Sequence, residues 1–222
     1  MIITIDGPAG SGKSTAARKL AARLGIAYLD TGAMYRTIAL AALQQKVRLE
    51  DERALIDLAG KCDIQVDCGP THTRVTLDGV EVSEAIRTMA VNQATSYVAR
   101  APAIRKLLVE KQREIGQKLG SLVTEGRDQG SVVFPDADVK FFLDASLEKR
   151  AERRYTELMA DGEAASYDEI LQNLRHRDGN DQCQWAPLLR PDTATRIDTT
   201  NMTIPEVIER LYAEVLARRA GR

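Results

Sequence analysis

The segment from Ile2 to Ser14 reads IITIDGPAGSGKS. Its first residues alternate in a β-branched pattern that predicts a short strand. Residues Gly7–Ser14 then match the pattern G-x-x-x-x-G-K-[ST] at every fixed position. Apolar side chains at helical spacing follow from Lys13 to Leu24. A strand, a glycine-rich loop and a helix in this order predict a P-loop, which binds the phosphates of a nucleotide.

The residue types of this loop suit a triphosphate for physical reasons. Glycines allow backbone N–H groups to approach phosphate oxygens, and the helix N-terminus adds partial positive charge. We expect Lys13 to reach the β- and γ-phosphates and Ser14 to coordinate Mg²⁺. The predicted ATP-binding residues are Gly7, Pro8, Ala9, Gly10, Ser11, Gly12, Lys13, Ser14 and Thr15.

The rest of the chain alternates between strand and helix patterns. Further strands are expected near residues 26–29, 122–125, 139–144 and 195–198, with helical patterns between them. This alternation predicts the α/β class, with a parallel sheet flanked by helices. Residues 61–85 instead alternate with period two around Asp78-Gly79, which predicts a small antiparallel hairpin insert.

We expect a single P-loop domain with three regions. The helical patterns after the hairpin complete an inserted subdomain. A polar, glycine-containing region with helices near 147–159 and 167–177 is expected to form a short lid. The expected boundaries are a core of 1–60, 117–150 and 190–222, an insert of 61–116 and a lid of 151–189.

Composition excludes several other classes. The 222 residues carry a formal net charge of -1, which argues against a general nucleic-acid binder. No run of about 18 apolar residues predicts a membrane span, and the N-terminus lacks a signal peptide pattern. Three cysteines without C-x-x-C spacing favour neither a disulfide framework nor a zinc site. We therefore expect a cytoplasmic monomer with no membrane or nucleic-acid partner.

Arginines recur near the expected ends of strands and helices around the P-loop. The guanidinium fork pairs with phosphate at two points and keeps its charge when desolvated. Arg127 directly follows an expected strand, and Arg36 ends the Asp30–Arg36 segment after another, which is where open α/β sheets bind ligands. The whole set is Arg36, Arg87, Arg105, Arg127, Arg150, Arg153, Arg154 and Arg177.

These features together favour a small kinase over other P-loop proteins. The guanine-reading motif N-K-x-D is absent, and Ala145 follows the strand ending at Asp144, where an ATPase often has a glutamate. An acceptor phosphate oxygen is already a competent nucleophile, so catalysis needs positioning and charge stabilisation more than a general base.

The combined motifs resemble the bacterial cytidylate kinases, within the P-loop nucleoside monophosphate kinases, over nearly the whole chain. Beyond the P-loop, the matching stretches are Asp30–Arg36 (DTGAMYR), Val82–Thr88, Glu125–Asp128 (EGRD), Val132–Ala137, Phe142–Ser146 and Arg177–Asp181. One departure is Gln184, which stands where the family often has an arginine at the end of its lid motif.

The resemblance implies a reaction and a role for each matching residue. The reaction would be Mg²⁺-assisted transfer from ATP to CMP or dCMP. Thr31, Arg105 and Asp128 would face the cytosine, and Arg36 and Arg127 would hold the acceptor phosphate. Ser96, Arg177 and Asp181 would contact the ribose or the closing lid. The implied catalytic residues are Lys13, Arg127, Arg153 and Arg154.

Base chemistry agrees with this assignment, but other functions remain open. Cytosine offers acceptors at O2 and N3 and a donor at N4, which suit an arginine and an aspartate.

A related small kinase could instead use UMP, AMP, shikimate or dephospho-coenzyme A. A nucleotide-binding regulatory module would bind or hydrolyse ATP without a small acceptor. A P-loop with a purely structural role is the third alternative.

Overall fold

The computed structural model describes residues 1–160, 162, 166–185 and 194–220, without the side chains of 182–185. Residues 161, 163–165 and 186–189 of the predicted lid, and 190–193 and 221–222 of the predicted core, lie outside the described part. The chain divides into two compact units, Met1–Leu20 with Glu125–Arg222 and Ala21–Thr124, which are described in turn. Within the described residues, no helix is both long and apolar enough to cross a bilayer.

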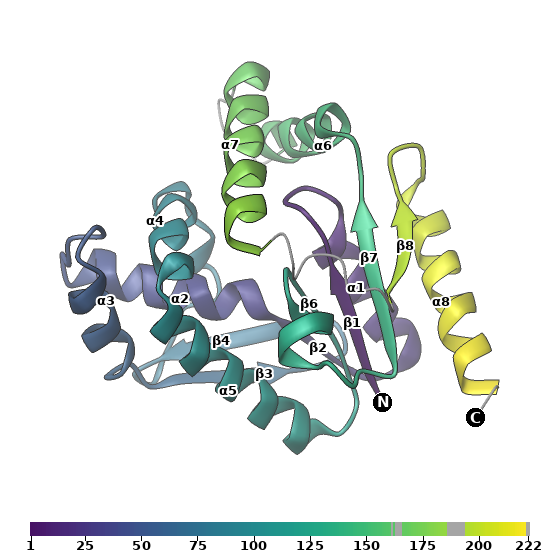
Figure 1. Cartoon of the computed structure of the whole chain (residues 1–222), viewed down its shortest axis with the longest axis horizontal. Helices are drawn as coiled ribbons and strands as arrows, with labels where there is room; N and C mark the ends of the chain where they lie inside the picture. The colour runs from purple at the N-terminus through teal and green to yellow at the C-terminus, as the bar shows by residue number, and fades with distance from the viewer. Residues whose placement is uncertain (161, 163–165, 186–193, 221–222) are drawn as a thin grey trace. The chain divides into compact units, whose positions relative to one another are not determined.

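The large sheet has the strand order β2-β6-β1-β7-β8. In the first unit, β1 (Ile2–Asp6) pairs in parallel with β7 (Val139–Asp144), which pairs in parallel with β8 (Thr195–Asp198) (Figure 1). Asp6 is opposite Phe142 and Asp144 is opposite Asp198, so the carboxyl ends of these strands meet at one edge. β1 and β7 are almost wholly buried, as the apolar run in β7 predicts.

One helix of the first unit packs against β7, and two others pack against each other. α1 (Lys13–Leu24) begins at the end of the P-loop, and α8 (Ile204–Ala220) packs against β7. α8 begins with a capping box, in which Thr203 and Glu206 accept hydrogen bonds from each other's backbone N–H groups. α6 (Leu147–Ala160) packs against α7 (Tyr167–Trp185). β6 (Leu122–Gly126) leads into a π-helical turn at Gln129–Val133.

The sequence prediction ended the second lid helix at Arg177, and this boundary is wrong. α7 continues through Gly179 to Trp185. Gly179 suggested a break because glycine costs about 1 kcal/mol in a helix interior. Two ion pairs offset that cost: Asp178 binds Arg150, and Asp181 binds Arg127.

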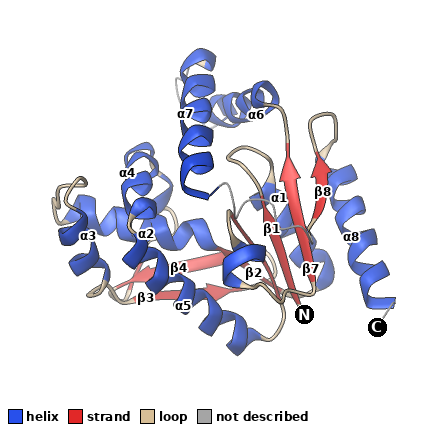
Figure 2. Cartoon of the chain, in the orientation of Figure 1, coloured by secondary structure: helices blue, strands red, loops and turns tan. Residues whose placement is uncertain are grey.

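The second unit contains the predicted antiparallel hairpin. β3 (Ile64–Cys68) pairs with β4 (Thr73–Leu77), and β4 pairs with the short β5 (Val80–Glu81) (Figure 2). Asp78 and Gly79 make the turn, both with positive φ, as the Asp-Gly signal predicts. The predicted parallel sheet and small antiparallel sheet are therefore both confirmed.

Helices make up most of the second unit. α2 (Thr31–Gln44) follows β2 (Ala27–Asp30) directly and packs against α4 (Met89–Arg100). Thr88 accepts a hydrogen bond from the Val91 N–H and caps α4. The other helices of the unit are α3 (Glu52–Ala59), the short 3₁₀ turn Ala85–Arg87 and α5 (Pro102–Leu119).

Candidate active site

The P-loop has the tight path that its glycines predicted. Gly7 passes so close to β7 that a Cβ atom there would lie 2.0 Å from the Leu143 carbonyl oxygen. Gly10 has a φ of +76°, and a Cβ there would lie 3.0 Å from the Cβ of Arg150. Side chains at either position would force the loop backbone away from its neighbours. The glycines therefore keep the loop N–H groups free of covering side chains.

Lys13 is almost fully buried at the start of α1. Its Nζ donates a 2.9 Å hydrogen bond to the Pro8 carbonyl oxygen, which holds the side chain back along the loop. Burial lowers the pKa of Lys13 to about 7, and the positive charge of Arg127 acts in the same direction. Glu125 and Asp181 oppose this shift. The site thus holds a poorly solvated cation, which the negative charge of a phosphate would stabilise.

Ser14 and Glu125 lie together beside Lys13. The Ser14 hydroxyl donates a 2.7 Å hydrogen bond to Oε1 of Glu125, which is 6% exposed at the end of β6. A hydroxyl and a carboxylate are the oxygen ligands that Mg²⁺ prefers, directly or through water. Among the described residues, no group of three or more His, Cys, Asp or Glu side chains could hold a metal. These residues fit an ion that takes its other ligands from a nucleotide and water.

Asp6 connects the P-loop to the segment that follows β6. Its two carboxylate oxygens accept 2.8 Å hydrogen bonds from the N–H groups of Gln129 and Gly130. Burial raises the pKa of Asp6 to about 6, although these two hydrogen bonds oppose the shift. Because Asp6 directly precedes Gly7, it fixes the π-helical turn after Asp128 to the start of the loop. Asp128 itself is buried.

Two predicted ligands from distant parts of the sequence meet in the first unit. Arg127 donates from Nε to Asp181 on α7 over 2.9 Å, and each side chain is 22% exposed. Arg177, one turn earlier on α7, lies close enough to Lys13 to contribute to its pKa shift. The structure therefore places Arg127 and Asp181 in contact, and the charges of Arg127, Arg177 and Asp181 all act on Lys13, while their roles as ligands stay predictions.

The two predicted lid arginines have different surroundings. Arg153 donates to the Thr199 carbonyl over 2.6 Å and to the Thr199 hydroxyl over 3.1 Å. Its Nη1 also lies 3.5 Å from the Ser11 carbonyl oxygen, so this guanidinium borders the P-loop. Arg154 instead pairs with Glu157 over 3.2 Å on the exposed surface of α6.

In the second unit, two arginines converge on Asp30. Arg36 lies 2.8 Å and Arg87 3.9 Å from the same carboxylate oxygen. The other oxygen of Asp30 caps α2 by accepting from the Ala33 N–H. Thr31 is buried in the first turn of α2. Within the described residues, the buried Nε of Arg36 has no hydrogen-bond partner, so this guanidinium has spare donor capacity.

The remaining predicted ligands lie on the two following helices. Ser96 is exposed on α4, where its hydroxyl donates to the Gln93 carbonyl. Arg105 lies half-buried in the first turn of α5. The side chain of Gln184 lies outside the described part of the chain. Arg36 and Arg87 thus meet at Asp30 within this unit, and Thr31 follows Asp30 at the start of α2; their roles as ligands stay predictions.

The structure places four further residues at the P-loop: Asp6, Glu125 and Thr199, to which sequence reasoning gave no role, and Arg150, which it named only within the set of arginines. Glu125 bonds Ser14, and Asp6 anchors the turn after Asp128. The buried Thr199 donates to Asp144 and Ser11 carbonyl oxygens, and Arg150 binds the Ala9 carbonyl. Only Asp6 and Glu125 carried a usable signal, because each ends a buried strand beside a glycine motif.

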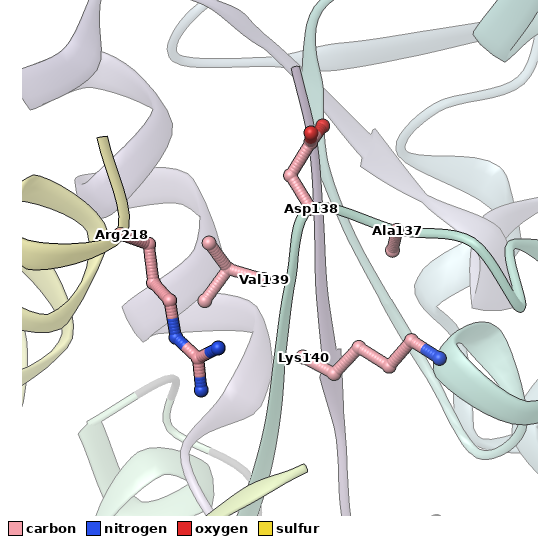
Figure 3. Close-up of a pocket in the computed structure, with 5 residues that line it drawn as sticks. All are labelled: Ala137, Asp138, Val139, Lys140 and Arg218. Atoms are coloured by element: carbon pink, nitrogen blue, oxygen red, sulfur yellow. The ribbon is translucent and has the colours of Figure 1, made fainter. Parts of the chain in front are cut away.

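A pocket of about 240 Å³ lies elsewhere in the first unit (Figure 3). Ala137, Asp138, Val139, Lys140 and Arg218 line it. Val139 starts β7, whereas the P-loop adjoins the carboxyl end of that strand. The pocket is therefore at the opposite end of the strand from the phosphate-binding loop.

A family model and two similar proteins carry the same description. The family model for cytidylate kinase matches residues 3–217. A protein named cytidylate kinase from Caldanaerobacter subterraneus subsp. tengcongensis is 48% identical over 99% of this chain and 96% of its own length. Another of that name from Aeromonas salmonicida is 45% identical over 96% of this chain and 92% of its own.

A solved structure has a similar fold at much lower sequence identity. An uncharacterized protein from Eubacterium ventriosum aligns over 98% of both chains, with a TM-score of 0.52 and 12% identity. At that identity, the likeness concerns the fold alone.

Proposed function

We propose that this chain, which belongs to the cytidylate kinase family, transfers the γ-phosphoryl group of ATP to CMP and dCMP. The observation that carries the proposal is the buried Lys13 beside the P-loop, with Arg127, Arg177 and Asp181 close to it. This arrangement supplies a triphosphate site and, next to it, the cations that a second phosphate requires. The full-length similarity to cytidylate kinases supports CMP as the acceptor.

In this proposal the P-loop binds the donor. Backbone N–H groups from Gly7 to Ser14 hold the β-phosphate, and Lys13 leaves the Pro8 carbonyl to reach the β- and γ-phosphates. Ser14 would hold Mg²⁺, and Glu125 would accept a hydrogen bond from a metal-bound water. When bound, Mg²⁺ neutralises charge on the phosphate oxygens during transfer.

Transfer itself requires alignment more than acid–base chemistry. A phosphate oxygen of CMP forms a bond to the γ-phosphorus of ATP, while the bond to the β–γ bridging oxygen breaks and its electrons leave with ADP. Arg36 and Arg127 hold the acceptor phosphate, and Arg153 stabilises charge near the P-loop. Arg154 would have to exchange its exposed partner Glu157 for phosphate oxygens.

We assign base and sugar recognition to the other residues that the resemblance names. Asp128 accepts from the cytosine amino group, while Arg105 and Thr31 donate to the ring. Uracil has a donor at N3 and an acceptor at position 4, where cytosine has an acceptor and a donor. With uracil bound, the polar groups of Asp128 and Arg105 that face the base would lose their hydrogen-bond partners. Ser96, Arg177 and Asp181 contact the ribose, with 61–116 as the monophosphate-binding insert and 151–189 as the lid.

The proposal also covers the protein's surroundings. We propose a cytoplasmic monomer whose partners are small molecules, with no membrane or nucleic-acid partner. The net charge of -1 supports the absence of a nucleic-acid partner, and recognition of a single nucleotide needs only local cations.

An acceptor panel in a coupled ADP-release assay tests the function. We expect CMP and dCMP to give the highest kcat/KM, with UMP, AMP, shikimate and dephospho-coenzyme A well behind. Lys13→Met serves as the inactive control, so that contaminating kinases are detected. If another acceptor gave a higher kcat/KM than CMP, that acceptor would take the place of CMP in the proposal. Stable ATP binding without acceptor-dependent turnover would favour a regulatory module instead.

A further inference from the structure

Arg150 is a buried arginine whose guanidinium bonds three separate segments of the first unit. Its side chain is 6% exposed. Nε donates to the Ala145 carbonyl over 3.0 Å, and Nη1 donates to the Ala9 carbonyl of the P-loop over 3.1 Å. Nη1 and Nη2 also donate to the carboxylate of Asp178, Nη1 to Oδ1 over 3.0 Å and Nη2 to Oδ2 over 2.6 Å. One side chain thus connects β7, the P-loop and α7.

The contact with Asp178 lies in a part of α7 beyond its apolar cluster. Among the described side chains of this helix, Ile170 and Leu174 join Ala9, Ala151 and Leu158 in one buried cluster, and the partly buried Leu171 packs against it. Those residues belong to the first two turns of α7. Asp178 lies one turn further on, beside Arg177 and three residues before Asp181. The ion pair therefore sets the position of the segment that carries both proposed ligands.

We propose that Arg150 and Asp178 are positioning residues that hold α7 in register with the P-loop, so that Arg177 and Asp181 stand beside Lys13. The inference rests on the proposed CMP kinase activity, because it concerns the alignment of acceptor and donor. Neither residue needs to touch a substrate. Two hydrogen bonds join the guanidinium of Arg150 to the carboxylate of Asp178. They fix both the distance and the angle between the two groups, which is what positioning α7 requires.

The variant Asp178→Asn tests the pair with little change in shape. An asparagine has one acceptor oxygen, and its amide nitrogen would face a guanidinium N–H. Hydrogen exchange measured on the nucleotide-free protein should show faster exchange in residues 175–185 and unchanged exchange in α8. We expect kcat/KM for CMP to fall about tenfold, since small misalignments are costly in transfer reactions. The Kd for ATP should stay within about twofold, because Arg150 still binds Ala9.

Two further variants make the test specific. Glu152→Gln removes an exposed ion pair with Lys149 on α6 and should behave as wild type. Asp178→Glu keeps the charge and should recover part of the lost kcat/KM and of the hydrogen-exchange protection.

Normal exchange in α7 together with normal kcat/KM in Asp178→Asn would overturn the proposal. An equal loss of ATP affinity, activity and thermal stability would also overturn it, since that result describes a purely structural pair. If the wild-type protein did not turn over CMP, the proposed function would be wrong. The hydrogen exchange of α7 in Asp178→Asn would still decide whether the Arg150–Asp178 ion pair holds the helix.

Discussion

Ser14 Oγ lies 2.7 Å from Oε1 of Glu125, and the two residues are 111 positions apart in the sequence. The hydroxyl donates and the carboxylate accepts, at the carboxyl end of β6. The serine of the P-loop is therefore already oriented toward a buried negative charge. Ser14 would hold Mg²⁺ through its hydroxyl oxygen, and Glu125 would accept a hydrogen bond from a metal-bound water.

Replacing Glu125 by glutamine should weaken the response to Mg²⁺. The amide keeps a hydrogen-bonding partner for Ser14 but removes the negative charge that favours a divalent cation. We expect the Mg²⁺ concentration for half-maximal rate to rise about tenfold, in line with the loss of a residue that orients metal ligands. Titration of Mg²⁺ at fixed ATP and CMP measures this. Asp144→Asn is the control, because its carboxylate pairs with the exposed Arg196.

Replacing Lys13 by methionine should abolish transfer without unfolding the protein. The ammonium is the cation aimed at the β- and γ-phosphates, and we expect kcat to fall by about a thousandfold or more. The stem of the side chain is buried, and an apolar methionine of similar length avoids the cost of burying a charge. Thermal unfolding should therefore give an equal or higher Tm. A variant that lost activity together with a clearly lower Tm would argue for a structural lysine.

ATP binding should take up a proton near pH 8. In the free protein Lys13 has a pKa of about 7, so it is mostly neutral at pH 8. Phosphate oxygens favour the ammonium form and raise its pKa, so a proton enters as the nucleotide binds. We expect uptake of most of a proton at pH 8 and less at pH 7, where more of the lysine is already charged.

Calorimetry in two buffers with different ionisation enthalpies measures that uptake. Lys13→Met should bind ATP more weakly than the wild type. Its heat of binding should be the same in both buffers, because no proton is taken up. Uptake that persists in this variant would assign the proton to another group.

Base preference should respond to Asp128 and Arg105. Asp128→Ser removes the acceptor for the cytosine amino group, and Arg105→Met removes a donor to the ring. Each change should narrow the ratio of kcat/KM between CMP and UMP by about tenfold, the usual cost of a lost buried hydrogen bond. Asp136→Ser, on the exposed segment after the π-helical turn, is the matched control. Unchanged base preference in both variants would refute these contacts.

The local parts of the site could be predicted from the sequence because each has its own pattern. The P-loop, the DTGAMYR segment after β2 and the Asp-Gly hairpin are defined by neighbouring residues. The partners of Arg150 and Arg153 could not be predicted, since Asp178 and Thr199 are 28 and 46 positions away. The length of α7 was underestimated for the same reason: contacts with Arg127 and Arg150 outweigh the helix propensity of Gly179.

A crystal structure with CMP and a non-hydrolysable ATP analogue tests the central claim most directly. We predict the triphosphate on the backbone of Gly7–Ser14, the CMP phosphate bound by Arg36 and Arg127, and Asp128 within hydrogen-bond distance of cytosine N4. A CMP molecule whose phosphate touched neither arginine, or whose base amino group faced away from Asp128, would contradict the account.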